Sequence, residues 1–327
     1  MTTLIVTHSG DNYCAPTVID ALKSRGERVF RFDTDRFPTE VRLALHDGDG
    51  AEGWRVTDGD DSLDLGEVTA VWYRRASIAA KLPKDMDPQL RSAALGESQR
   101  TVQGMLAGIG AFTLDPIERI RAAEHKPLQL RVAERLGLEI PRTLVTNDPD
   151  AVRAFAARCA NGMITKMLSS FAVYEDGKEM VVFTNPVTAE HLDDLEGLDL
   201  CPMCFQESVP KALELRVIVV GERVFAASID SQSSKKARHD WRRDGNEMIA
   251  DWKHYTLPQE VTAKVLKLMD HFRLNYGAID IIVTPDGRHV FLEINPAGEF
   301  FWLERAPGLP ISDALADVLT GRARRRA

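Results

Sequence analysis

The sequence has few cysteines and no long hydrophobic run. Only four of its 327 residues are cysteine, which fits a reducing compartment. Cys14 and Cys159 are isolated, and the Cys201/Cys204 pair lacks the second pair or the nearby histidine that a zinc site requires, so we expect packed or incidental thiols. No stretch approaches the length of a membrane span, and the apolar run at residues 4–6 is much too short for a secretion signal. We therefore expect a cytoplasmic protein with no membrane partner.

The chain also lacks an excess of positive charge. It has 41 lysine and arginine residues against 49 aspartate and glutamate residues, which gives a net charge of −8. General nucleic-acid-binding proteins carry the opposite balance, so we expect no nucleic-acid partner. The one basic cluster, residues 321–326, is expected to be a frayed and solvated end.

A third absence is the glycine pattern of dinucleotide-binding folds. Strands are expected at residues 4–7, 27–32 and 68–73 and a helix at 15–25, which is the layout of an α/β unit with a parallel sheet. The first turn, residues 7–12, contains no G-x-G-x-x-G, which excludes NAD binding of that type. No Ser-His-Asp or Cys-His combination has a sensible spacing, so a covalent enzyme intermediate is not expected.

Strand and helix patterns divide the chain into three parts. We expect an N-terminal α/β domain at residues 1–115, a small α+β lid domain at 116–205 and a C-terminal α+β domain at 206–327. The sheet of the last part is expected to include strands at 205–209, 215–220 and 223–229, followed by a hairpin at 278–283 and 289–294.

That hairpin is the most informative feature of the sequence. We expect Val283 to face Val290 across a turn that contains Pro and Gly. This register places Asp280 directly opposite Glu293, with Asn295 on the same face. Opposed carboxylates destabilise a ladder unless a cation lies between them, and two carboxylates with a carboxamide suit Mg²⁺ that holds a nucleotide phosphate. The alternative is an edge hairpin with solvated acids, which a one-residue slip in register would favour.

Two basic residues lie in apolar strands. Lys166 belongs to the otherwise apolar run 162–167, and Arg216 begins the nearly all-apolar strand Val217–Val220. An unpaired cation in such a strand is costly, so each is expected to have an anionic partner. For Arg216 this partner is a carboxylate or a phosphate, and Glu214 in a plain ion pair is one candidate.

The order and spacing of these residues resemble the ATP-grasp ligases. The matching positions run from Lys126 through Lys166, Gln206, Glu207, Val209, Glu214, Arg216, Asp280 and Glu293 to Asn295. The resemblance implies an ATP-grasp fold with an N-terminal pre-ATP-grasp domain, a lid domain and a C-terminal domain, and it implies ATP and Mg²⁺ as cofactors. By this resemblance Lys126 and Lys166 meet phosphates, Gln206, Glu207 and Val209 belong to the adenine hinge, Glu214 contacts ribose, Asp280, Glu293 and Asn295 hold the metal, and Arg216 and Lys166 act in catalysis.

Three further segments resemble the microviridin-type and plesiocin-type peptide ligases, also called graspetide synthetases. These segments are residues 71–75 (Val-Trp-Tyr-Arg-Arg), 237–242 (Ala-Arg-His-Asp-Trp-Arg) and 292–304. The resemblance implies phosphorylation of Asp or Glu side chains in a ribosomally made precursor peptide, which has a leader and a Thr/Glu-rich core. Attack by a Thr/Ser hydroxyl or a Lys amine then closes an ω-ester or ω-amide macrocycle.

Peptide-contacting residues are predicted on two charged groups. The candidates are Arg74, Arg238 and Arg242 for carboxylates of the core, and Glu190, Asp193 and Asp194 for a basic leader. Surface charge is the alternative for the arginines, and the solvated face of a short helix is the alternative for the acids.

Two other functions stay open at this stage. One is another ATP-grasp carboxylate-amine ligase, such as an amino-acid ligase or a RimK-like enzyme that modifies a protein. The other is a catalytically silent peptide-binding module that kept the ATP-grasp fold. The sequence also leaves open the choice of ester or amide, and of monomer or homodimer.

Overall fold

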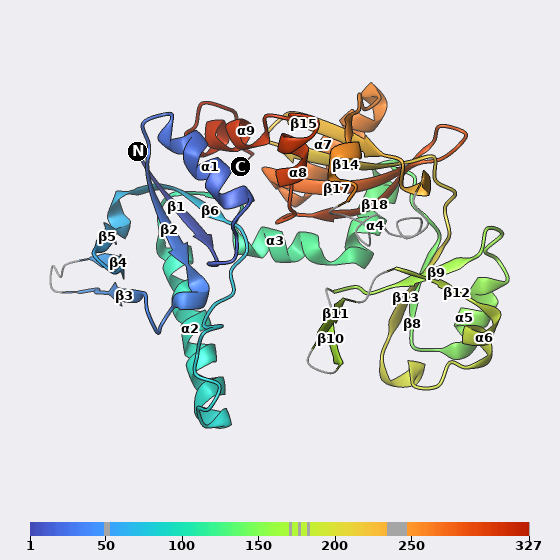
Figure 1. Cartoon of the computed structure of the whole chain (residues 1–327), viewed down its shortest axis with the longest axis horizontal. Coiled ribbons are helices and arrows are strands. Elements are labelled where there is room, and N and C mark those ends of the chain that lie inside the picture. Colours follow the sequence, from blue (N-terminus) through green and yellow to red (C-terminus); the bar gives the residue numbers. More distant parts are fainter. Residues whose placement is uncertain (49–52, 170–171, 176–177, 182–183, 234–246, 327) are drawn as a thin grey trace.

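The protein has a mixed α/β fold with several separate sheets (Figure 1). The computed structural model describes residues 1–48, 53–169, 172–175, 178–181, 184–233 and 247–326. Within these ranges, no helix combines the length and the apolar character needed to cross a bilayer.

The N-terminal part contains the predicted parallel sheet. Its four strands lie in the order β2-β1-β6-β7, and every neighbouring pair is parallel. They are β1 (Thr2–Thr7), β2 (Arg28–Asp33), β6 (Val68–Tyr73) and β7 (Phe112–Leu114), accompanied by α1 (Cys14–Lys23) and α2 (Pro88–Gly108). Leu4, Ile5 and Val6 are all fully buried although they are consecutive, so both faces of β1 are covered. A smaller antiparallel sheet consists of β3 (Arg42–Leu45), β4 (Trp54–Asp58) and β5 (Asp61–Asp64).

The central part is an antiparallel sheet of four strands in the order β12-β9-β13-β8. These strands are β8 (Thr143–Thr146), β9 (Met163–Lys166), β12 (Asn185–Val187) and β13 (Met203–Glu207), with helices α5 (Pro149–Ala156) and α6 (Ala189–Asp193). A separate hairpin is formed by β10 (Ala172–Glu175) and β11 (Lys178–Val181). The expectation that residues 205–209 belong to the last sheet is wrong. Phe205 is buried with Met163 and Val152 in the central core, which keeps β13 in the central sheet.

The C-terminal part is a five-stranded sheet in the order β16-β15-β14-β17-β18. Its strands are β14 (Leu213–Val220), β15 (Arg223–Ile229), β16 (Lys253–His254), β17 (Tyr276–Val283) and β18 (His289–Asn295). Its helices are α3 (Ile117–Glu124), α4 (Lys126–Arg135), α7 (Gln259–Phe272), α8 (Phe301–Arg305) and α9 (Ile311–Leu319). Alternate residues of β14 belong to two cores: Leu215, Val217 and Val219 pack with α3, α4 and α7, whereas Ile218 and Val220 pack with α8 and α9.

The hairpin of β17 and β18 contains the predicted pair of acids, since Asp280 lies opposite Glu293. The expected pairing of Val283 with Val290 is wrong, because Val283 pairs with His289. The turn between the two strands is one residue shorter than expected, and Thr284 N donates to Arg288 O at 3.0 Å across it. A β-bulge between Asp280 and Ile281 then restores the register at the acids.

The first and last parts of the chain share one core. Val18 and Leu22 of α1 are buried in the same cluster as Leu315 and Val318 of α9, and Figure 1 shows these two helices side by side near both chain ends. Arg25, just after α1, adds ion pairs of 3.0 Å to Asp313 and to Asp317 of α9.

The basic segment at residues 321–326 is docked, so the expectation of a frayed end is wrong. The guanidinium of Arg325 lies over the ring of Phe112, 3.9 Å from its centroid. Arg326 donates its backbone N–H to Asn275 Oδ1 at 2.6 Å and pairs with Asp270 at 2.6 Å. This segment is therefore held by specific contacts with both the N-terminal sheet and the C-terminal part.

These cores indicate a division of the chain that differs from boundaries at residues 115 and 205. Helices α3 and α4 pack with the C-terminal sheet, and β13 continues to Glu207. We propose that the central unit comprises residues 143–207, and that α3 and α4 belong to the C-terminal unit.

Asp115 provides a test of how the N-terminal sheet is joined to the C-terminal sheet, because it follows β7 and contacts the start of β17. Its carboxylate, with 2% of the residue exposed, accepts hydrogen bonds from Asn275 N (2.8 Å), Asn275 Nδ2 (3.0 Å) and Tyr276 N (2.9 Å). Asp115→Ala leaves these buried donors without an acceptor, so it should lower the free energy of unfolding by about 3 kcal/mol or more. Urea denaturation measures this loss. The exposed Asp20→Ala control should change stability by less than about 0.5 kcal/mol, and equal midpoints for the two variants would contradict the assignment.

Candidate active site

The centre of the site is a row of four charged side chains across the C-terminal sheet. The strand register places Arg216 of β14 beside Asp280 of β17, and Asp280 beside Glu293 of β18. Arg216 Nη1 lies 2.9 Å from Asp280 Oδ1, and Lys126 Nζ lies 3.0 Å from Glu293 Oε2. The row therefore reads cation, acid, acid, cation. Each acid has a basic partner on its outer side, which offsets the repulsion between the two carboxylates.

Lys126 connects this row with the central sheet. It is the first residue of α4, and its ammonium also donates to the carbonyl of Met167 at 3.2 Å. Met167 follows β9 directly. One side chain thus bridges the end of β9 and the acid of β18.

A cleft opens between the central sheet and the C-terminal sheet. Its lining includes seven of the predicted site residues, namely Lys166, Gln206, Glu207, Val209, Glu214, Asp280 and Glu293. Apolar side chains, among them Ile164, Leu215 and Leu292, complete the walls. A cleft that combines apolar walls with both basic and acidic groups suits a ligand that has an aromatic part and an anionic part.

Lys166 lies in this cleft with an unfavourable electrostatic environment. Burial lowers the pKa of its ammonium, because little water reaches the charged form. An anionic ligand in the cleft would reverse this effect. Two other predicted residues have protein partners: Gln206 Nε2 donates to Thr143 Oγ1 at 2.9 Å, and Glu214 pairs with Lys211 at 3.0 Å. Arg216 pairs with Asp280, whereas Glu214 pairs with Lys211. The predicted alternative of an Arg216–Glu214 ion pair is therefore wrong.

The donor set at Asp280 and Glu293 fits Mg²⁺ held together with a phosphate ligand. Among the residues that the structure describes, no group of three or more His, Cys, Asp or Glu side chains could hold a metal alone. Mg²⁺ usually takes one or two carboxylates and completes its shell with phosphate oxygens and water, so two opposed carboxylates beside an open cleft are sufficient.

Comparison with known proteins agrees with this geometry. Residues 2–121 match the pre-ATP-grasp domain of MvdD. The macrocyclase MdnC from Microcystis aeruginosa MRC, solved with the precursor peptide MdnA, is 53% identical to this chain, and the match covers 98% of this chain and 100% of MdnC with a TM-score of 0.89. The chain belongs to the ATP-grasp peptide macrocyclase family. The resemblance inferred from the sequence is thereby confirmed, and so is the predicted α/β ATP-grasp fold.

Two further proteins that are similar to this chain are informative. An ATP-grasp ligase from Chryseobacterium gregarium, solved with ADP, a leader and a core peptide, is 39% identical and covers 99% of this chain and 98% of its own, with a TM-score of 0.94. A probable alpha-L-glutamate ligase of Teredinibacter turnerae is 25% identical over 220 residues, which are 66% of this chain and 69% of the relative. The likeness to the peptide ligases therefore extends over more of the chain.

Several predicted residues are not among those that line the cleft. Asn295 is exposed, and its Oδ1 accepts the backbone N–H of Ala297 at 3.0 Å. Arg74 is buried in an ion-pair network with Asp11 and Glu299, so the alternative of a surface charge is wrong for it. The remaining candidates are listed by position: Glu190, Asp193 and Asp194 are exposed on and after α6, whereas Arg238 and Arg242 lie outside the described residues.

Three residues of the site were missed from the sequence. Gln129 is fully buried and uses its side-chain amide to pair with the backbone of Ile294, accepting from its N–H at 3.0 Å and donating to its carbonyl at 2.8 Å. It thereby holds edge strand β18 against α4. Lys211 lines the cleft, and Glu299 contacts Arg216 through its carbonyl at 3.0 Å. Only Gln129 had a sequence signal, as a polar residue on the apolar face of a helix.

Charge compensation in the row can be measured by a double-mutant cycle. Lys126→Met removes the cation that lies 3.0 Å from Glu293, so we expect a loss of about 1–2 kcal/mol in unfolding free energy. The double variant Lys126→Met/Glu293→Gln should recover part of this loss. Urea denaturation of the four proteins gives the coupling. The exposed pair of Arg28 and Glu67, 2.8 Å apart, is the control and should show almost none. Strict additivity at Lys126 and Glu293 would contradict the compensation.

Proposed function

We propose that this protein is an ADP-forming ligase that macrocyclises a ribosomally made precursor peptide. It phosphorylates Asp or Glu side chains of the core and couples them to Thr/Ser hydroxyls or Lys amines as ω-esters or ω-amides. The observation that carries this proposal is the charged row of Arg216, Asp280, Glu293 and Lys126 beside the cleft, in a chain that aligns from end to end with a peptide-bound macrocyclase. We place the reaction in the cytoplasm, where ATP and newly made peptide are both present.

We expect ATP to bind in this cleft in one orientation. The apolar walls and the segment from Glu207 to Val209 are suited to adenine, and Glu214 to the ribose hydroxyls. The phosphates would then lie toward Lys166, which lines the cleft, and toward Lys126, which pairs with the cleft residue Glu293. Phosphate oxygens would replace Glu293 as the partner of Lys126.

Asp280 and Glu293, with Asn295 two residues further on β18, are the residues that would hold Mg²⁺. Bound there with the nucleotide, Mg²⁺ would neutralise phosphate charge and orient the γ-phosphate. Arg216 and Lys126 hold the two carboxylates at this position.

The chemistry consists of two displacements. A carboxylate oxygen of the core attacks the γ-phosphorus, the bond to the β,γ-bridging oxygen breaks, and ADP leaves. A hydroxyl or amine of the same peptide then attacks the acyl carbon and loses its proton, and phosphate leaves with one former carboxylate oxygen. Arg216, whose planar guanidinium is fixed beside the metal ligand Asp280, is placed to stabilise the charge that develops on the acyl phosphate.

Peptide recognition is proposed for two regions. The exposed acids Glu190, Asp193 and Asp194 in and after α6 are accessible to a basic leader. The core carboxylate requires cations near the γ-phosphate, for which we retain Arg238 and Arg242. Arg74 is assigned instead to the buried network described below.

The second candidate function is a ligase that adds glutamate or another amino acid to an acceptor. The likeness to a probable alpha-L-glutamate ligase favours it, and the nucleotide chemistry would be identical. Only the nature of the acceptor separates the two functions.

The decisive test is incubation of the protein with Mg·ATP and a Thr/Glu-rich precursor peptide that carries its leader. Each ring should lower the peptide mass by one water, as measured by mass spectrometry, and hydroxide should reverse the change if the ring is an ester. Omission of ATP is the control. A precursor that keeps its full mass, while free glutamate is ligated to another acceptor, would replace the first function with the second.

Nucleotide binding and chemistry can be separated at two residues. Lys166→Ala should weaken the binding of a non-hydrolysable ATP analogue, because a buried phosphate partner is lost. Arg216→Ala should leave that affinity within a few fold yet lower turnover by on the order of 10²-fold, as loss of a transition-state donor does. Calorimetry and an ADP-release assay measure the two effects. Unchanged turnover in Arg216→Ala would reduce this residue to the counterion of Asp280.

A further inference from the structure

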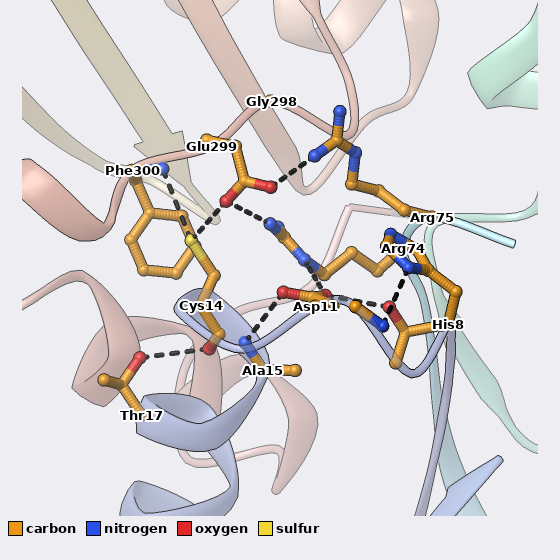
Figure 2. Close-up of polar contacts among 12 residues, drawn as sticks. His8, Asp11, Cys14, Ala15, Thr17, Arg74, Arg75, Gly298, Glu299 and Phe300 are labelled. Atoms are coloured by element: carbon orange, nitrogen blue, oxygen red, sulfur yellow. Dashed lines mark hydrogen bonds and ion pairs between the residues drawn. The ribbon is translucent and has the colours of Figure 1, made fainter. Parts of the chain in front are cut away.

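The loop between β18 and α8 carries an acid that points toward the N-terminal sheet. Figure 2 shows the carboxylate of Glu299 between Arg74, Arg75 and Cys14. It accepts from Arg74 Nη2 at 2.6 Å and from Cys14 Sγ at 2.8 Å, and it also pairs with Arg75 Nη1. Three residues of the N-terminal part thus hold one carboxylate of the C-terminal part.

These partners are themselves fixed. Arg74 is 2% exposed, pairs through Nε with Asp11 at 2.6 Å, and lies over the rings of Trp72 and Phe300. Burial and the neighbouring Glu299 raise the pKa of the Cys14 thiol to about 12, so the thiol stays protonated and acts as the donor. The two arginines and two acids balance in charge, which leaves no net charge for a bound ion.

The backbone carbonyl of Glu299 contacts Arg216, which belongs to the row of four charged side chains. Arg216 Nη2 donates to the carbonyl of Glu299 at 3.0 Å, while Arg216 Nη1 donates to Asp280 at 2.9 Å. The two ends of the guanidinium are therefore held by a metal-site carboxylate and by the Glu299 loop. A shift of this loop would rotate the guanidinium relative to Asp280.

The loop has little room to shift on its own. Tyr276 Oη donates to the carbonyl of Gly298 at 2.6 Å. A Cβ atom at position 298 would lie 2.5 Å from Ala278 Cβ and 2.6 Å from Arg216 Nη2, so only glycine allows this approach. The backbone at 298–299 and the guanidinium of Arg216 are packed directly against each other.

We propose that Glu299 is a positioning residue for Arg216, through which the N-terminal domain sets the orientation of the catalytic guanidinium. This role rests on the proposed function of Arg216 in acyl phosphate formation. The Arg74 and Arg75 pairs hold the Glu299 side chain, the side chain holds its carbonyl, and the carbonyl holds Arg216. The N-terminal domain thereby contributes to catalysis although none of these contacts involves the nucleotide cleft.

The test compares turnover with ATP-analogue affinity in Glu299→Gln and in the milder Arg75→Gln. Arg75 is half exposed, so its variant keeps the buried Arg74 pair and the fold. Turnover should fall by about tenfold or more in Glu299→Gln and by a smaller factor in Arg75→Gln, with the analogue Kd within about twofold of wild type. Denaturation midpoints report on folding.

Two comparisons separate positioning from simple adhesion between domains. Arg25→Gln removes ion pairs to Asp313 and Asp317 across the same junction without touching Arg216, so it should lower stability but not turnover. In an Arg216→Lys background, where one ammonium cannot hold both acceptors, Glu299→Gln should cause no further loss of turnover. Equal turnover losses in both backgrounds, or a loss in Arg25→Gln that matches Glu299→Gln, would overturn the proposal. A wild-type protein that forms no rings contradicts the proposed function, whereas ring formation at normal turnover in Glu299→Gln contradicts only this inference.

Discussion

The opposition of Asp280 and Glu293 across a single ladder is the constraint on which the rest of the site depends. Two carboxylates side by side are tolerated only with compensating charge. The protein supplies it from both flanks, with Arg216 on β14 and Lys126 at the start of α4. This explains why α4 is held against the edge strand by the buried amide of Gln129.

Local patterns were sufficient for much of the fold and for the centre of the site. The β1, β2 and β6 strands followed from short apolar runs, which depend on neighbours in sequence. The Asp280–Glu293 pair was also predicted, but from a register that is one residue out at the turn and that the bulge restores at the acids. The bulge near Asp280 could not be predicted. It arises from a turn that closes one residue early, and the hydrogen bond that closes it leaves no mark in the hydrophobic pattern.

What the sequence could not indicate were partners that lie far apart in the chain. Arg74 was expected at the peptide, yet its neighbours are Asp11 and the distant Glu299. The basic segment at 321–326 was expected to be solvated, yet its acceptors lie on Asn275 and Asp270. Placing β13 in the wrong sheet has the same origin, since an apolar strand is compatible with either sheet until its buried neighbours are known. The charge and the strand propensity of a residue can be read from the sequence. The place of Arg74, of residues 321–326 and of β13 depends instead on contacts with residues that are distant in the chain.

The shared core of α1 and α9 has a consequence for the order of folding. The apolar face of α1 is buried in a cluster with Leu315 and Val318, which belong to the last helix of the described chain. During synthesis from the N-terminus, β1, β2 and β6 can pair early, but this face of α1 stays open to water until α9 has left the ribosome. The N-terminal domain therefore reaches its final stability last, although it is made first.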